Sequence, residues 1–71
     1  MMHMQRMGER IGILRQEKGM TQSVLAEKMG ITPQAISKWE RGMSFPDLSR
    51  LEELAKMLEV SVDYLLTGKD A

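Results

Sequence analysis

Two polar residues, Ser37 and Lys38, follow Gln34 by three and four residues, so a helix would place the three side chains on one face. A glutamine amide can pair with adenine N6 and N7, and a lysine can donate to guanine O6 and N7 or to a phosphate. The serine hydroxyl can contact either. Directly before them, Thr32 offers a hydroxyl and Pro33 only an apolar contact, for example with a thymine methyl. The pattern predicts contact with base edges in the major groove of double-stranded DNA, and the alternative is a solvated polar face.

A second set of residues could hold phosphate groups. Thr21 and Gln22 begin a predicted helix, and the unpaired N–H groups and the dipole of a helix N-terminus favour an anion. Arg41 is a cation one turn beyond Ser37 and could pair with a phosphate. Each residue has an alternative. Thr21 could act as a helix cap, which is compatible with a phosphate contact, Gln22 could be an ordinary solvated residue, and Arg41 could offset the dipole at a helix C-terminus.

The spacing of Ala26, Gly30 and Ile36 indicates the elements that would position these side chains. Ala26 is small enough for two helices to approach closely. Gly30 can adopt the positive φ that a tight turn between them requires. Ile36 would fill the wedge between the helices. The second helix would then project outward as a rod whose width fits the major groove, so the spacing predicts a helix-turn-helix.

Apolar periodicity predicts an all-α fold, a compact five-helix domain without strands. The first helix is expected from Met7 to Glu17, with Gly12 weakening it and Ile13 exposed. Trp39 is expected in the core. The expected N-terminal residues of the other four helices are Thr21, Thr32, Asp47 and Ser61, and the expected ends of the second, third and fifth helices are Met29, Gly42 and Gly68.

The fourth predicted helix carries an apolar stripe, which we expect to face inward. The short fifth helix should pack three residues against the core. Residues 7–68 then form the domain, residues 1–6 a frayed N-terminal extension and residues 69–71 a C-terminal tail. The stripe of the fourth helix comprises Leu48, Leu51, Leu54, Ala55 and Leu58, and the fifth helix contributes Tyr64, Leu65 and Leu66.

Composition excludes several kinds of site in this chain of 71 residues, which is the size of one small domain. There is no cysteine, and His3 is the only histidine, so disulfides, thiolate metal sites and His-based metal clusters are excluded. No apolar run approaches the roughly 18 residues of a membrane span, and no signal-peptide pattern is present. We expect a soluble, cytoplasmic protein without a metal or a cofactor.

The formal net charge is zero, but the charges are unevenly distributed. Residues 1–42 carry seven basic and four acidic side chains, and residues 43–71 carry three basic and six acidic ones. The predicted helix-turn-helix therefore lies in the basic half, as expected for a segment that meets a phosphate backbone. The alternative is a chance asymmetry.

The chain resembles the lambda-repressor-like DNA-binding domain of the phage repressor, Cro and XRE families over roughly residues 8 to 68. Members are typically transcriptional repressors that bind palindromic operators in double-stranded DNA as homodimers. The resemblance is carried by Gly8-Glu9-Arg10-Ile11, Leu14-Arg15, Gly19-Met20-Thr21-Gln22, Leu25-Ala26, Gly30-Ile31, Gln34 to Gly42, Pro46-Asp47 and Val60 to Leu66.

The resemblance also implies roles for particular residues. Gln22 matches a phosphate-contacting glutamine, and the turn after the reading helix, with Arg41, Met43 and Ser44, would follow the sugar-phosphate backbone. Arg15 and Glu40 match positions that form a partly buried ion pair with a structural role. The implied dimer contacts are Phe45, Pro46, Val60 and Val62, for which burial in the core is the alternative.

Two other classes of function are alternatives to a DNA-binding regulator. A protein-interaction module on the same helices, antitoxin-like or an adaptor, would suit the zero net charge and Pro33. An enzyme is not expected, because no paired-carboxylate pocket, nucleophile arrangement or phosphate-binding loop is recognisable. Both a complete short regulator and an excised domain fit the sequence.

Overall fold

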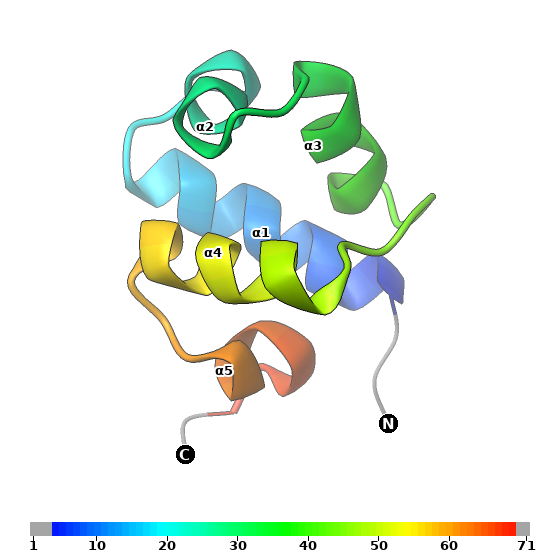
Figure 1. Cartoon of the computed structure of the whole chain (residues 1–71). Coiled ribbons are helices and arrows are strands. Elements are labelled where there is room, and N and C mark those ends of the chain that lie inside the picture. Colours follow the sequence, from blue (N-terminus) through cyan, green and yellow to red (C-terminus); the bar gives the residue numbers. More distant parts are fainter. Residues whose placement is uncertain (1–3, 70–71) are drawn as a thin grey trace.

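The structure, a computed structural model, describes residues 4–69, with side chains from Arg6 onward, and this part of the chain forms five helices without a strand (Figure 1). The predicted all-α fold is confirmed. The helices are α1 (Met4–Glu17), α2 (Gln22–Met29), α3 (Pro33–Glu40), α4 (Leu48–Leu58) and α5 (Val62–Thr67).

The first helix begins at Met4, three residues before the predicted Met7. The physical reason is that Gln5 and Arg6 are good helix formers and that no capping residue stands at the predicted start. Residues 1–3 of the expected extension and residues 70–71 of the expected tail lie outside the described residues.

The helix N-termini follow the predicted capping pattern. Thr21, Thr32, Asp47 and Ser61 each have extended backbone, and each side chain accepts a hydrogen bond from the N–H three residues later, at 2.9–3.3 Å. These bonds satisfy N–H groups that have no partner within the helix. Gly30 ends α2 at φ 70°, as the predicted turn requires.

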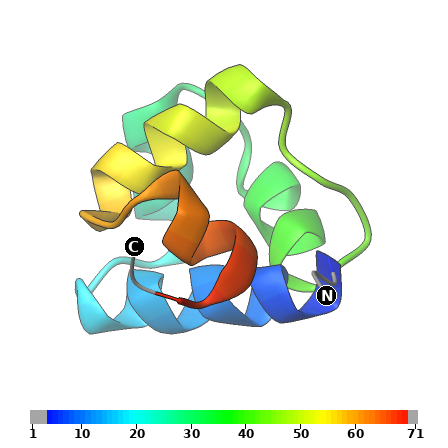
Figure 2. The same ribbon diagram turned by 90° about the horizontal axis from the view of Figure 1, so that it is seen from below.

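The helices pack around one core (Figures 1 and 2). In Figure 1, α2 and α3 lie at one end, α5 lies at the other, and α1 and α4 lie between them. Figure 2 shows α5 lying against α1, a pair that is in contact. All five helices contribute to the buried apolar residues, which are Met7, Ile11, Leu25, Ala26, Met29, Ile36, Trp39, Leu51, Leu54, Ala55, Leu58 and Leu65.

Burial agrees with most of the expected inward faces. On α5, Leu65 is buried and Leu66 packs partly buried against the core, whereas Tyr64 is only half-buried. Trp39 is buried and Ile13 is exposed, as predicted. Leu48, predicted on the inner face, is 67% exposed, and this prediction was wrong. It is the first residue of α4, at an end that the neighbouring helices leave uncovered. No helix in residues 4–69 is long and apolar enough to span a bilayer.

Candidate functional site

The outward side of α3 presents the residues singled out for base contact. Pro33 occupies the first turn, where its missing N–H removes no helical hydrogen bond. Thr32, Gln34 and Lys38 are exposed, and Ser37 is half-buried. The opposite side of α3 contributes Ile36 and Trp39 to the core. The helix is therefore amphipathic, and its polar face lies open to a partner.

Two glycines of α1 allow α3 to approach closely. A Cβ added to Gly8 would lie 2.3 Å from the carbonyl oxygen of Trp39 and 2.6 Å from that of Glu40. A Cβ on Gly12 would lie 3.2 Å from Oε1 of Glu40. Sequence reasoning missed Gly8 and interpreted Gly12 only as a weak point, although glycines four residues apart on one helix face are a signal of close helix packing.

The expected ion pair between Arg15 and Glu40 is formed across this junction. Arg15 Nε lies 2.6 Å from Glu40 Oε2, Arg15 Nη2 donates to Oε1 at 3.1 Å, and the two side chains are only 10% and 12% exposed. Arg15 Nη1 also donates to the carbonyl oxygen of Met20 at 2.8 Å. The hydrogen bond and charge of Glu40 raise the pKa of Arg15 against the opposing effect of burial. The pair fixes the C-terminal end of α3 on α1.

Gln22 is held by the same carboxylate. Its Nε2 donates to Glu40 Oε1 at 3.1 Å, and the residue is half-buried. Because an ionised carboxylate only accepts, the amide must turn its nitrogen toward Glu40. The second N–H on Nε2 is still available, so Gln22 can donate to another acceptor without leaving Glu40.

The N-terminus of α2 beside Gln22 has the features of an anion site. Thr21 Oγ1 accepts from the N–H of Val24 at 3.0 Å, so the capping role is present. The N–H groups of Gln22 and Ser23 have no intrahelical acceptor, because the helix begins there. With the positive end of the helix dipole, they favour a negative group at this position.

The turn after α3 engages some of its own polar groups. Arg41 is exposed, and its Nε donates to Ser37 Oγ at 3.1 Å and to the Ser37 carbonyl oxygen at 3.3 Å. The N–H of Met43 donates to the carbonyl oxygen of Lys38 at 2.8 Å. Met43 can therefore contact a phosphate backbone only through its side chain, which is 62% exposed, whereas Ser44 is half-buried.

Three arginines use their guanidinium groups to join helices. Besides Arg15, Arg10 donates to the carbonyl oxygen of Leu65 at 2.7 Å, and Arg50 donates to that of Met29 at 3.1 Å. Both carbonyls lie near helix C-termini, where a cation is favoured. Arg10 and Arg15 of the basic half therefore take part in packing, and Lys38 and Arg41 are the exposed cations on and directly after α3.

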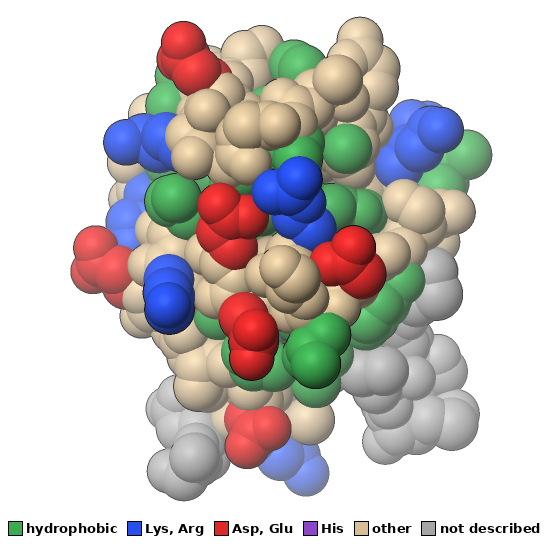
Figure 3. All heavy atoms as spheres, in the orientation of Figure 1, with side chains coloured by type: hydrophobic (Ala, Val, Ile, Leu, Met, Phe, Trp, Pro, Cys, Tyr) green, Lys and Arg blue, Asp and Glu red, His purple; other side chains and the backbone are tan. Residues whose placement is uncertain are grey.

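The face shown in Figure 3 carries mixed charge. Acidic and basic side chains are interspersed over α4, whose sequence includes Arg50, Glu52, Glu53 and Lys56. Such a surface offers no continuous basic patch for a phosphate backbone. The α3 side therefore remains the candidate site. Within residues 4–69, no group of three or more metal-ligating side chains is placed to hold an ion.

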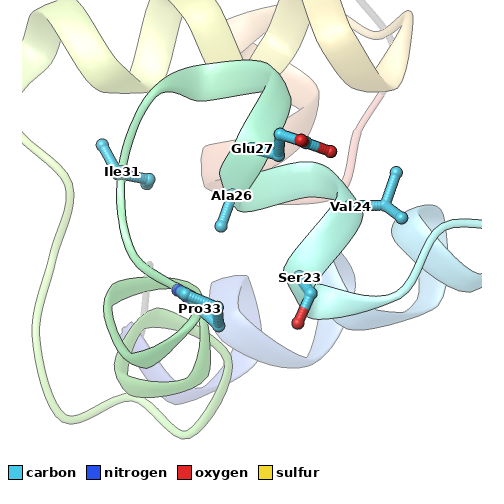
Figure 4. Close-up of a pocket in the computed structure, with 6 residues that line it drawn as sticks. All are labelled: Ser23, Val24, Ala26, Glu27, Ile31 and Pro33. Carbon is cyan, nitrogen blue, oxygen red and sulfur yellow. The ribbon is translucent and has the colours of Figure 1, made fainter.

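A hollow of about 350 Å³ lies beside the N-terminus of α3. In Figure 4, the side chain of Ala26 on α2 points toward the space between α2 and Pro33, whereas the side chains of Val24 and Glu27 point away from Pro33. The lining is largely apolar, and the carboxylate of Glu27 would repel a phosphate, so we do not assign this hollow to phosphate contact. The lining residues are Ser23, Val24, Ala26, Glu27, Ile31 and Pro33.

The expected dimer contacts do not form one exposed surface. Phe45 is 38% exposed, whereas Pro46 is buried and Val60 and Val62 pack partly buried against the core. Leu48, which the sequence placed in the core, joins Phe45 and Met43 as an exposed apolar side chain in or next to the segment between α3 and α4.

A family model described as Helix-turn-helix matches residues 8–65. The repressor protein C2 of Salmonella phage P22 is 42% identical over 67 residues, which are 94% of this chain and 31% of that protein. The prophage-derived regulator YonR of Bacillus subtilis (strain 168) is 44% identical over 64 residues, which are 90% of this chain and 59% of that protein. The chain thus spans between about a third and three-fifths of the length of these relatives.

Two solved structures extend this similarity to the fold. The P22 c2 repressor in complex with a synthetic operator superposes with a TM-score of 0.85 at 41% identity, covering 89% of this chain and 96% of that one. The biofilm regulator SinR in complex with DNA superposes with a TM-score of 0.76 at 40% identity, covering 83% of this chain and 95% of that one.

Proposed function

The chain belongs to the lambda-repressor-like helix-turn-helix family of phage repressors and XRE regulators, and from this premise we propose that it binds double-stranded DNA sequence-specifically as a transcriptional regulator. The observation that carries the proposal is the open polar face of α3, with Gln34 exposed in its first turn and Lys38 in its last turn. Relatives solved in complex with DNA support it.

Base contacts are assigned to the N-terminal part of α3, which enters the major groove in this mode of binding. Gln34 pairs with adenine N6 and N7, and Lys38 donates to guanine O6 and N7 or to a phosphate. Ser37 contacts a base edge. Thr32 and Pro33 lie at the N-terminal end of α3, where Pro33 offers an apolar contact. These five residues lie at the N-cap and within the two turns of α3, so they can reach only a few base pairs, which corresponds to a short half-site.

Phosphate contacts are assigned to two places that flank α3. At the start of α2, the N–H groups of Gln22 and Ser23 meet one phosphate, and the second N–H of the Gln22 amide adds a donor that Glu40 has already oriented. Beyond α3, Arg41 pairs with another phosphate, helped by Ser44 and by the side chain of Met43. Both sets fix the register of α3 without reading sequence.

We assign the dimer surface to the segment between α3 and α4. Phe45 and Leu48 are exposed apolar side chains there, and a second copy of the chain would cover them. Two copies related by a two-fold axis would place their α3 helices about one DNA turn apart, and a palindromic operator matches that symmetry. The regulator is then a repressor if its operator overlaps a promoter.

The test is selection of bound duplexes from random DNA, followed by affinity measurements on the winner over a range of salt. The proposal expects an inverted repeat and a log K that falls by about 0.9 per neutralised phosphate for each log unit of salt. If no sequence is enriched at any salt, the protein-interaction module is the better proposal, with the exposed Met43, Phe45 and Leu48 as its surface.

A matched pair of variants tests the division of roles on α3. Gln34→Ala should relax the preference at one base pair, at a cost of about 1–3 kcal/mol in discrimination. Arg41→Ala should lower the affinity for all duplexes and leave the preference at the Gln34 base pair unchanged. If both variants weaken every sequence equally, the assignment of Gln34 to base contact is wrong.

A further inference from the structure

Ser37 and Arg41 form a bonded pair on the outward side of α3. Three hydrogen bonds connect them: the N–H of Arg41 to the Ser37 carbonyl oxygen at 3.0 Å, and Arg41 Nε to that oxygen at 3.3 Å and to Ser37 Oγ at 3.1 Å. The guanidinium is therefore folded back along α3 with its Nε fixed. The two Nη groups remain at the outer end of the planar fork and can still pair with a phosphate.

This bond constrains the hydroxyl of Ser37. A serine hydroxyl has one O–H donor and two acceptor lone pairs, and its hydrogen normally rotates to suit the partner. The Nε–H of Arg41 is a charged donor that occupies one lone pair, and such charge-assisted bonds are about twice as strong as neutral ones. Because one lone pair of Ser37 Oγ is occupied, the O–H is the group best placed to bond a further partner in front of Ser37. In residues 4–69, the O–H of Ser37 donates to no protein acceptor.

We propose that Arg41 is a positioning residue that makes Ser37 a hydrogen-bond donor to DNA, so that Ser37 reads a base acceptor, such as a purine N7, guanine O6 or thymine O4. Exocyclic amino groups of adenine and cytosine, which only donate, are disfavoured at the same point. This inference rests on the proposed DNA-binding function. It adds one specificity rule to a residue otherwise assigned only to phosphate contact.

Without the bond from Arg41, Ser37 would show a different base preference. A hydroxyl with both lone pairs free could turn to accept from an amino group or to donate to a carbonyl, and serine is known to contact either kind of base edge. Removal of the Arg41 bond should therefore widen the tolerance at one base pair and leave the other positions as they were. A lost phosphate contact alone would not change the preference at any single base pair.

The experiment uses the selected operator and four proteins: the unmodified chain, Ser37→Ala, Arg41→Lys and, as a control, Ser49→Ala. Ser49 is an exposed serine of α4. The base pair read by Ser37 is identified as the one whose substitution cost falls most in Ser37→Ala. At that pair, the acceptor is removed with 7-deazaguanine or 7-deazaadenine for a purine N7, 2-aminopurine for guanine O6, or 5-methyl-2-pyrimidinone for thymine O4. In separate duplexes, a base with an amino group replaces the acceptor.

We expect each base replacement in the operator to weaken the binding of the unmodified protein and of Ser49→Ala about tenfold. The same replacements should weaken the binding of Ser37→Ala about twofold or less. Arg41→Lys keeps the positive charge but lacks Nε. It should bind every duplex more weakly, and the penalty for the amino-bearing base should shrink to about twofold. Thermal unfolding followed by circular dichroism should be similar for all four proteins.

Two results would overturn the proposal while DNA binding itself stands. One is an Arg41→Lys protein that keeps the full penalty for the amino-bearing base. The other is an unmodified protein that prefers an amino group at the Ser37 base pair. If the unmodified protein enriches no sequence, the proposed function fails and this rule fails with it.

Discussion

The inward side of α3 is packed against α1, whereas its outward side is open to solvent. On the inward side, the backbone at Trp39 and Glu40 lies so near Gly8 that a methyl group would not fit, and the Glu40 carboxylate is shared by Arg15 and Gln22. On the outward side, Gln34 and Lys38 are exposed. One short helix therefore carries two separate tasks: its inward side sets its position and its outward side recognises a partner. Changes on the inward side should reduce stability, and changes on the outward side should reduce binding alone.

The largest effect is expected from Glu40→Ala. This change leaves the guanidinium of Arg15 largely buried without its partner, and we expect the free energy of unfolding to fall by about 3–5 kcal/mol. Urea denaturation measures it. The control is Glu27→Ala, because Glu27 is exposed and its loss should change stability by no more than about 0.5 kcal/mol. A loss below about 1 kcal/mol for Glu40→Ala would mean that the inward side is not held by this ion pair.

Gly8→Ala should come next, with a loss of about 1–3 kcal/mol, because its Cβ would overlap backbone atoms that cannot move without separating α1 from α3. Gly12→Ala is the matched control. Its Cβ would meet only a side-chain oxygen, and the gain in helix propensity of up to about 1 kcal/mol should offset that contact. Equal losses for the two variants, measured by urea denaturation, would contradict the assignment of the close contact to Gly8.

Leu48→Glu tests an exposed residue of the proposed dimer surface. Leu48 is 67% exposed, and a carboxylate suits the first turn of a helix, so stability should change by no more than about 0.5 kcal/mol. If Leu48 lies in the dimer surface, operator affinity should fall by about 1–2 kcal/mol, and sedimentation should show weaker self-association. Ile13→Glu is the control, since Ile13 is 57% exposed on α1, away from that surface. Similar affinities for both variants would remove Leu48 from the dimer surface.

The smallest effect is expected at Lys18 and Glu59, an ion pair that is exposed where Arg15–Glu40 is buried. Lys18 Nζ lies 2.8 Å from Glu59 Oε1, and its hydrogen bond and charge lower the pKa of Glu59 from the ordinary 4.5. A lowered pKa in the folded state stabilises the fold above the pKa of the unfolded state. This contribution is lost as the pH falls through the lowered value.

Glu59→Gln should therefore be slightly less stable than the unmodified chain at pH 7 and equally stable in strong acid. Added salt should remove the difference at pH 7, because exposed charges are screened. Urea denaturation at several pH values and salt concentrations measures both trends. A difference that persists in high salt would show that the exposed pair resembles the buried one.

Much of the fold follows from interactions between residues three or four apart. The four N-caps, the left-handed Gly30 and the inward stripes of most helices could be predicted, because a hydroxyl or carboxylate bonds the backbone of its own first turn and a helix repeats every 3.6 residues. The prediction from helical spacing was wrong for Leu48. Its spacing matches the stripe, but no helix covers the end of α4 on which it lies.

The candidate site divides in the same way. From sequence alone, residue types and helical period determined which side of α3 would be polar and where the helices would begin, since these depend on near neighbours in the chain. The packing of the helices, in contrast, determines that Gly8 admits the α3 backbone, that Glu40 orients Gln22, and that Leu48 stays outside the core. The physical reason is that each of these outcomes depends on how separate helices pack, and no local pattern specifies which atoms meet across that distance.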